Sequence, residues 1–138
     1  MMRNTGMTTE LFWLAMTVSL TGLMWVPYII RRVTEKGMLQ VLVCPQVDKS
    51  TTSAWSQRMM MAHQNAIENL ALFAPLVLML HVTGMNTAYT ATACAVYFYT
   101  RLAHYLVYSL GIPVLRTPVF AVSFGALVAL ALTLFGLI

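Results

Sequence analysis

Four long apolar segments alternate with shorter polar segments along the chain. They cover residues 10–30, 56–81, 86–109 and 118–137. Each is a continuous apolar run of about 20 residues, the length that an α-helix needs to cross the hydrocarbon core of a bilayer. Strands of a membrane β-barrel would instead alternate over about ten residues. The pattern therefore predicts an all-α protein with four membrane-spanning helices.

The composition supports a membrane protein. Hydrophobic residues make up 59% of the chain and charged residues 9%, against about 25% charged in soluble domains. With 138 residues, four spans leave room for little else, so we expect one transmembrane domain over 1–138. The first apolar segment resembles a secretory signal, but it is long, lacks a following cleavage site and is closed by Arg31 and Arg32. We therefore expect a retained span.

The positions of the basic residues predict the orientation. Six basic residues lie in the two connections on one side and at the mouth of the second span: Arg31, Arg32, Lys36, Lys49, Arg58 and Arg116. The other side of the membrane carries only Arg3. The positive-inside rule places both connections in the cytoplasm and both termini outside it, as in a protein of a bacterial inner membrane. The net charge of +4 is thus an orientation signal, and a nucleic-acid partner is not expected.

The connection over residues 31–55 is the one long segment expected to be irregular. Residues 38–45 within it are apolar enough to lie on the membrane surface or to cover a partner. Residues 50–53 offer several N-caps for the second span. Cys44 and Cys94 are expected to be small buried residues without a disulfide, and the Cys and His spacings indicate no metal site.

Polar residues in the second span share one side of the predicted helix. At 100° per residue, Asn65 and Asn69 each fall within about 20° of Arg58, with Met61 and Glu68 about 60–80° to one side. Polar groups at this depth are costly unless they are paired or functional. This stripe is the strongest functional signal in the sequence.

A second polar stripe lies on the third span, within a sector of about 100°: Tyr97, Arg101, His104, Tyr105 and Tyr108. Arg101 and Glu68 both lie about 12–18 Å from the cytoplasmic ends of their helices, which predicts an ion pair. Such a pair could serve only as a structural link between the two helices. We favour a polar cavity, because one pair does not account for the amides and tyrosines on the same sides. His104 taken alone is typical of a packing histidine.

The start of the fourth span carries Arg116, Thr117 and Pro118. Proline is favoured at the first helical position and threonine as the N-cap before it. Arg116 would then stand beside the positive end of a helix, which suits an anion and lowers the pKa of a bound thiol. The alternative is an arginine that only sets the topology.

These motifs resemble those of the membrane-associated proteins in eicosanoid and glutathione metabolism, the MAPEG family, over essentially the whole chain. The resemblance implies a left-handed-type four-helix bundle assembled as a homotrimer, with glutathione bound between subunits near the cytoplasmic side. It rests on three segments: Ala62-His63-Gln64-Asn65-x-x-Glu68-Asn69-Leu70, Arg101-Leu102-Ala103-His104-x-x-x-Tyr108, and Arg116-Thr117 after Gly111-Ile112-Pro113.

The resemblance also implies roles for individual residues. Asn65 and Glu68 match positions that hold the tripeptide, and Arg101, His104 and Tyr108 match positions that line the same pocket. Arg116 matches an arginine proposed to stabilise the glutathione thiolate, and Thr117 falls where one family enzyme has a serine.

Three positions depart from the family enzymes, because Met61, Asn69 and Phe120 each replace a residue that can donate a hydrogen bond. Arg58, one turn before Met61, is a candidate to supply the missing charge. A lipid-binding family member also has the Ala-His-Gln-Asn sequence. From the resemblance as a whole, we expect a glutathione-dependent transferase or peroxidase acting on an apolar electrophile from the membrane. The alternative is a non-catalytic lipid-binding or accessory subunit of the same fold.

Overall fold

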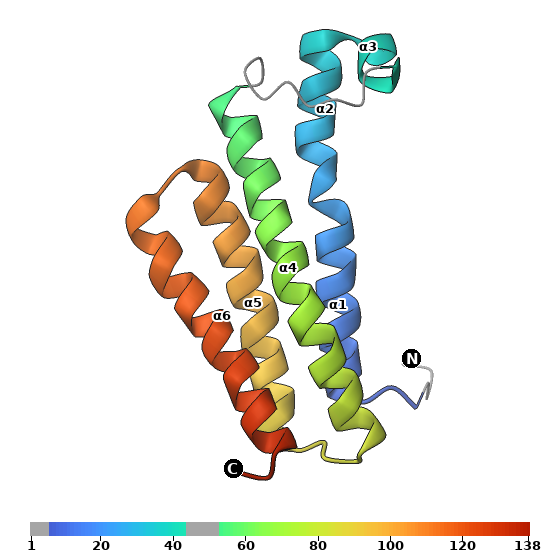
Figure 1. Cartoon of the computed structure of the whole chain (residues 1–138), viewed down its shortest axis with the longest axis vertical. Coiled ribbons are helices and arrows are strands. Elements are labelled where there is room, and N and C mark those ends of the chain that lie inside the picture. Colours follow the sequence, from blue (N-terminus) through green and yellow to red (C-terminus); the bar gives the residue numbers. More distant parts are fainter. Residues whose placement is uncertain (1–5, 44–52) are drawn as a thin grey trace, which may run out of the picture.

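A computed structural model describes residues 6–43 and 53–138, and every regular element in these ranges is an α-helix. The helices are α1 (Thr9–Leu23), α2 (Trp25–Lys36), α3 (Met38–Val43), α4 (Ala54–Val82), α5 (Ala88–Leu110) and α6 (Pro113–Leu134). The long helices lie side by side (Figure 1). The predictions made for Arg3, Cys44, Lys49 and residues 50–52 fall outside the described residues.

The predicted first span is longer than expected and is broken. α1 begins after Thr8, whose side chain caps the helix by accepting a hydrogen bond from the Leu11 N–H. Pro27 has no N–H to bond to the carbonyl one turn back, and the helix breaks at Met24 before continuing as α2. The Tyr105 hydroxyl donates to the Met24 carbonyl at 2.9 Å, so the broken turn is stabilised from α5.

Part of the first connection is helical, which corrects its predicted irregularity. α2 continues to Lys36, and α3 follows directly after Gly37. The six residues of α3 are apolar apart from Gln40, and Met38, Leu39, Leu42 and Val43 are exposed. The structure thus places an apolar helical turn at this end of the molecule, where the sequence predicted an apolar surface segment.

The second and third predicted spans correspond to α4 and α5. Ser53 caps α4 by accepting from the Ser56 N–H, as the sequence allowed. A reciprocal capping box between Thr87 and Thr90 starts α5. α5 ends at Gly111, which adopts φ +73°, a conformation that favours glycine.

The fourth helix begins earlier than predicted. α6 starts at Pro113, with Ile112 as the extended residue before it. Thr117 is therefore not the N-cap, and Pro118 lies inside the helix. The reason is that the left-handed Gly111 already ends α5, so the chain can turn within two residues and use Pro113 as the favoured first-position proline. Arg116 remains in the first turn of α6.

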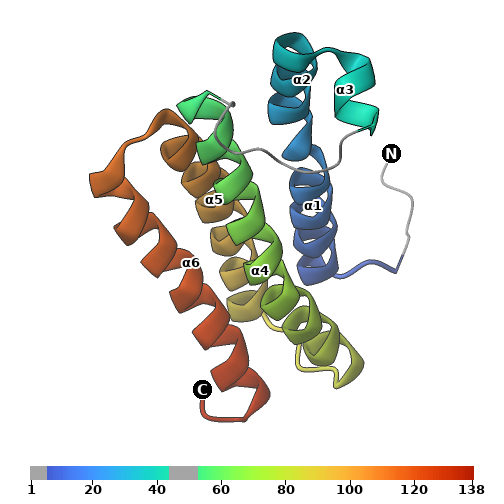
Figure 2. The ribbon, with the colours of Figure 1, turned by 45° about the horizontal axis from the view of Figure 1, so that its top comes forward.

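α5 is the central helix and packs against α1, α4 and α6. Figures 1 and 2 show α6 on one side of the α4–α5 pair and α1 on the other. Phe73 of α4 stacks on Tyr97 of α5, with ring centroids 3.9 Å apart, inside a core that also contains Cys94. A second core cluster joins α4 to the α1–α2 break through Met59, Ala62, Ala66, Met24 and Tyr105.

The start of α1, the α4–α5 turn and the end of α6 lie at one end of the molecule (Figure 1). The start of α4, the α5–α6 turn and α2 with α3 lie at the other end. We call this second end the basic end, because Arg31, Arg32, Lys36, Arg58 and Arg116 belong to its helices. The predicted clustering of basic residues on one side therefore agrees with the topology.

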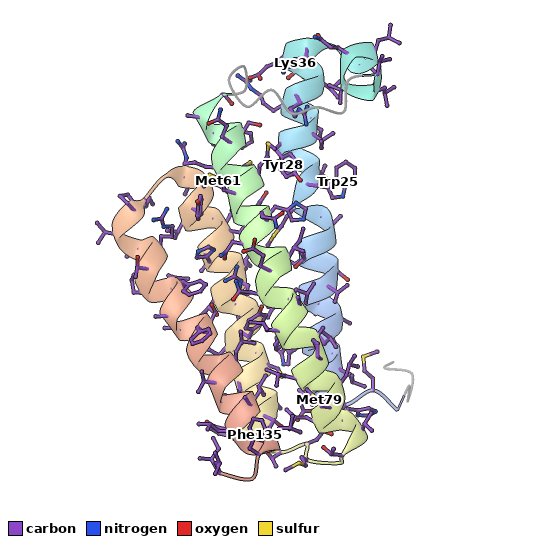
Figure 3. The ribbon with its side chains drawn as sticks, viewed as in Figure 1. Trp25, Tyr28, Lys36, Met61, Met79 and Phe135 are labelled. Carbon is purple, nitrogen blue, oxygen red and sulfur yellow. The ribbon has the colours of Figure 1, made fainter. Side chains whose placement is uncertain are left out.

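Within the described residues, three helical segments are long and apolar enough to cross a membrane: Thr9–Lys36, Ala54–Val82 and Pro113–Leu134. Many apolar side chains on them point outward (Figure 3). α5, the third predicted span, is not among the three segments, because it carries Arg101, His104 and several threonines and tyrosines. Its central position, which buries Arg101, His104, Tyr97 and Tyr105, explains how a more polar helix fits among apolar ones.

Candidate functional site

A groove runs along the first half of α4 toward the α5–α6 turn. It consists of two adjoining pockets of about 570 and 330 Å³ that share Met61 and Tyr108. The larger pocket is lined also by Gln57, Met60, Gln64, Asn65 and Glu68. The smaller pocket is lined also by Arg58, Gly111, Ile112, Pro113 and Arg116. We call the two pockets together the basic-end groove.

Two residues of the polar stripe of α4, Arg58 and Asn65, form hydrogen bonds with α5. The Arg58 Nε donates to the Ser109 carbonyl at 3.1 Å, near the end of α5. Two turns further along, Asn65 accepts a hydrogen bond from Arg101 at 2.6 Å. Asn69 is buried and donates back to the Asn65 carbonyl at 2.9 Å. The stripe thus fixes α4 to α5 while Arg58 and Asn65 also line the groove.

Arg101 is the buried centre of this network, with 2% of its surface exposed. Its Nη2 donates to the Asn65 Oδ1, and its Nη1 lies 3.4 Å from the Ser123 hydroxyl of α6. The Nε has no hydrogen-bond partner among the described residues. Arg101 therefore connects three helices behind the groove wall and does not line the groove itself.

The predicted ion pair between Glu68 and Arg101 is wrong within the described chain. Glu68 is exposed and accepts a hydrogen bond from the Gln64 amide at 3.1 Å. Glu68 lies about 60° around the helix from Asn65, so it points into the larger pocket while Asn65 reaches the arginine. The structure makes Arg101 a partner of a neutral amide and leaves the carboxylate available in the groove.

An aromatic and cationic wall closes the end of the groove. The Arg116 guanidinium lies over the Tyr108 ring, 5.0 Å from its centroid, within the range of a cation–π contact. The buried His104 ring stands 5.7 Å from the Tyr108 ring and 6.0 Å from the Phe120 ring. Its Nδ1 has no partner among the described residues. His104 therefore supports Tyr108 from behind, as a packing residue would.

The α5–α6 turn brings the two cations of the groove together. A Cβ added to Gly111 would lie 3.1 Å from the Arg58 Nε, so the glycine allows the Arg58 side chain to pass over the turn. Arg58 from α4 and Arg116 from α6 consequently line the same small pocket. Both guanidinium groups are then near enough to act on one anionic ligand.

The structure brings most of the predicted site residues together. Asn65, Glu68, Tyr108, Arg58 and Arg116 line the groove. Arg101 and His104 lie behind it, and the exposed Thr117 does not line either pocket.

Sequence reasoning missed Ser123, the α6 partner of Arg101, and Ser109, whose carbonyl holds Arg58. Gln57 and Met60 were missed as lining residues. A buried serine inside an otherwise apolar helix was the available signal for Ser123.

The sequence profile of the MAPEG family matches residues 10–136. The chain belongs to the MAPEG family. Its resemblance over nearly the whole length is thereby confirmed, and with the apolar helices it establishes an integral membrane protein. The family includes glutathione transferases and peroxidases as well as other members. No curated protein and no solved structure matches the chain significantly.

Proposed function

We propose that this MAPEG protein binds glutathione in the basic-end groove and uses it to conjugate or reduce an apolar electrophile that enters from the membrane. One observation carries the proposal: Arg58, Arg116 and Tyr108 share a pocket that adjoins the amides and the carboxylate of α4. This set of charges complements a tripeptide with two carboxylates and one ammonium group.

The groove residues fit glutathione by charge and by size. Arg58 can pair with one carboxylate, since guanidinium groups bind carboxylates with two parallel hydrogen bonds. The amides of α4 can donate to the other carboxylate, and Arg116 remains available to the thiolate. Glu68 is exposed in the larger pocket and can accept from an ammonium group. Together, the pocket volumes of about 570 and 330 Å³ are ample for a ligand of this size.

In the proposed mechanism, bound glutathione supplies a nucleophilic thiol. Arg116 lies in the first turn of α6 and is exposed, so its charge adds to the positive helix end. Both favour an anion nearby. The Tyr108 ring under the guanidinium holds it in place. Thr117 follows Arg116 but lines neither pocket, so Arg116 is the first candidate to stabilise the sulfur and Thr117 the second.

The electrophile would reach the groove along the aromatic face of α6. Phe120 and Phe124 lie nearly parallel, with ring centroids 6.3 Å apart, and Phe124 is exposed. They offer an apolar path from the lipid-facing surface toward Arg116. Phe120 stands where a family enzyme has a tyrosine, so this site lacks that hydroxyl and favours an apolar group.

We extend the proposal to the assembly. With α5 counted as a span, the chain is a four-helix membrane bundle with both termini outside the cytoplasm and the groove on the cytoplasmic side. Met61, Gln64 and Glu68 are exposed on α4, and a second subunit would cover them. The homotrimer implied by the family resemblance supplies such a subunit.

A second candidate function is a non-catalytic lipid-binding or accessory subunit. Met61 favours it, because this residue is 58% exposed and borders both pockets where family enzymes have an arginine. Arg58 compensates in part, since it lines the same pocket, but its Nε is held by Ser109. The two functions differ in whether a thiolate forms.

The deciding experiment uses purified protein in lipid nanodiscs. Calorimetry with glutathione tests binding, and ultraviolet difference spectra test for a bound thiolate, with S-methylglutathione as the control ligand that cannot ionise at sulfur. The enzyme proposal expects binding of both ligands and a thiolate band with glutathione alone. Binding without a thiolate band, or no binding, would contradict the enzyme proposal and favour the second candidate function.

A further inference from the structure

Arg32 is a buried cation at the basic end of the molecule. It is 8% exposed, and its Nε has no hydrogen-bond partner in the part of the chain that the structure describes. Its neighbour Arg31 behaves differently, because it is exposed and its Nε donates to Glu35 at 2.7 Å. A buried charge without a counter-ion is strongly unfavourable. Burial of its Nε therefore favours an anionic partner from outside the described residues.

The register of α2 against α4 shows what Arg32 faces. The Tyr28 hydroxyl lies 2.8 Å from the His63 Nδ1, so this side of α2 packs on α4. Arg32 is one turn after Tyr28 and shares its side of the helix. Since α4 runs in the opposite direction, Arg32 faces the stretch of α4 before His63.

Ser56 lies in that stretch, seven residues before His63 and therefore on the same side of α4. It is completely buried, and its hydroxyl has no hydrogen-bond partner among the described residues. Ser56 also lies in the first turn of α4, three residues after the Ser53 cap, where the helix dipole favours an anion. By this register, Ser56 lies about one turn beyond the level of Arg32, so both buried groups lie near the start of α4.

No described carboxylate is available to Arg32. Glu10 accepts from Thr90 at 2.6 Å at the opposite end of the molecule. Glu35 pairs with Arg31 and Glu68 with Gln64. The fourth acidic residue, Asp48, lies outside the described residues. Tyr28 and His63, the other polar groups on this side, are bonded to each other.

The position of Arg32 corresponds to the headgroup level of a bilayer. Trp25 and Ile30 are exposed earlier on α2, where lipid chains would contact them, and Lys36 ends the helix (Figure 3). The exposed apolar side chains of α3 follow directly. Basic pockets between helices at this depth suit the headgroups of anionic lipids.

We propose that Arg32 and Ser56 form a binding site for the phosphate group of an anionic phospholipid, between α2 and the start of α4. The guanidinium and the serine hydroxyl would donate to the phosphate oxygens, which would satisfy both unpartnered groups. The site is separate from the basic-end groove and does not depend on the proposed function.

Arg32→Gln tests this site, with Arg31→Gln as a control that removes the same charge from the adjacent, exposed position. Each protein is placed in nanodiscs of phosphatidylcholine alone or with phosphatidylglycerol, and bound lipid is counted by native mass spectrometry after gentle release. Thermal unfolding in detergent is followed with added phosphatidylglycerol or with inorganic phosphate. Ser56→Ala and Asp48→Asn complete the set.

The wild-type protein and Arg31→Gln should retain phosphatidylglycerol and gain thermal stability from it. Arg32→Gln should lower the apparent lipid affinity by about ten-fold or more, and Ser56→Ala by less. Stabilisation by inorganic phosphate alone would make the source a soluble phosphate and overturn the lipid assignment. Equal lipid retention by Arg31→Gln and Arg32→Gln would also overturn the site. So would an Asp48→Asn variant that loses stability as Arg32→Gln does but without any dependence on lipid.

Discussion

The Arg101 guanidinium of α5 donates a 2.6 Å hydrogen bond to the side-chain oxygen of Asn65 on α4. This bond decides what Asn65 can offer a ligand. Its oxygen is occupied by a buried cation, so its amide nitrogen is the group available in the larger pocket that it lines. Asn65 would therefore donate to a ligand carbonyl or carboxylate, and Arg101 acts through it as a positioning residue.

The first prediction concerns this pair. Arg101→Gln and Asn65→Ala should each lower thermal stability in detergent, and their free-energy losses should be non-additive by about 1–3 kcal/mol, because each change removes the same buried hydrogen bond. The control cycle combines Arg101→Gln with Glu68→Gln, which do not touch in the described chain. Additive losses in the first cycle, or coupling only in the second, would contradict the arrangement.

The second prediction concerns Arg116. Arg116→Ala should leave glutathione binding within a few-fold of wild type, since Asn65, Glu68 and Arg58 remain, but should abolish the thiolate band and lower turnover about 100-fold. Thr117→Ser and Thr117→Val separate the hydroxyl from packing. Because serine keeps the hydroxyl and Thr117 does not cap α6, Thr117→Ser should be near wild type. Unchanged thiolate absorbance in Arg116→Ala would remove Arg116 from the proposed mechanism.

The third prediction concerns the α5–α6 turn. Gly111→Ala should cost about 1–2 kcal/mol of stability, because alanine is strained at φ +73°, and its Cβ should also push the Arg58 side chain. Gly125→Ala is the control, since a Cβ there meets nothing within 4 Å and its φ is ordinary. Adding Arg58→Ala to Gly111→Ala should recover only the part of the stability loss that comes from the clash with Arg58, and not the part that comes from backbone strain. Equal melting temperatures for both alanine variants would contradict this account.

The fourth prediction concerns the exposed Met61. Met61→Arg should raise glutathione affinity about ten-fold, because it adds a charge-assisted donor at the junction of the two pockets. Met61→Gln adds a polar group of similar length without the charge and should change affinity little. Calorimetry measures both. Equal glutathione affinities of Met61→Gln and Met61→Arg would show that a positive charge at this position does not strengthen binding.

The fifth prediction concerns membrane topology. Reporter tags fused at residues 1 and 138 should report the extracytoplasmic side, and a tag inserted near Lys49 should report the cytoplasm, because the basic residues gather at one end of the bundle. Tags in an Arg31→Gln/Lys36→Gln variant test whether charge sets the orientation. A cytoplasmic C-terminus in the wild-type chain would place the groove on the other side.

The sequence by itself determined the helical class, the approximate positions of α4 and α5 and the two polar stripes that face each other. Those features follow from local rules, since apolar length specifies a membrane helix and 100° per residue specifies which side chains share a face. The family motifs were equally local. The break at Met24 and the early start of α6 at Pro113 were missed, because competing prolines and caps are resolved by packing and by the left-handed Gly111.

The tertiary structure alone decided the partners. Depth along two helices allowed Glu68 to meet Arg101, but a rotation of about 60° around α4 gave the arginine to Asn65 and left the carboxylate in the groove. Ser123 joined that network from a helix distant in sequence. Arg31 and Arg32 are identical in the sequence, and only the structure shows that Arg31 is exposed and Arg32 buried. Which side chain is buried against another helix depends on how helices rotate and approach, and no local spacing specifies that.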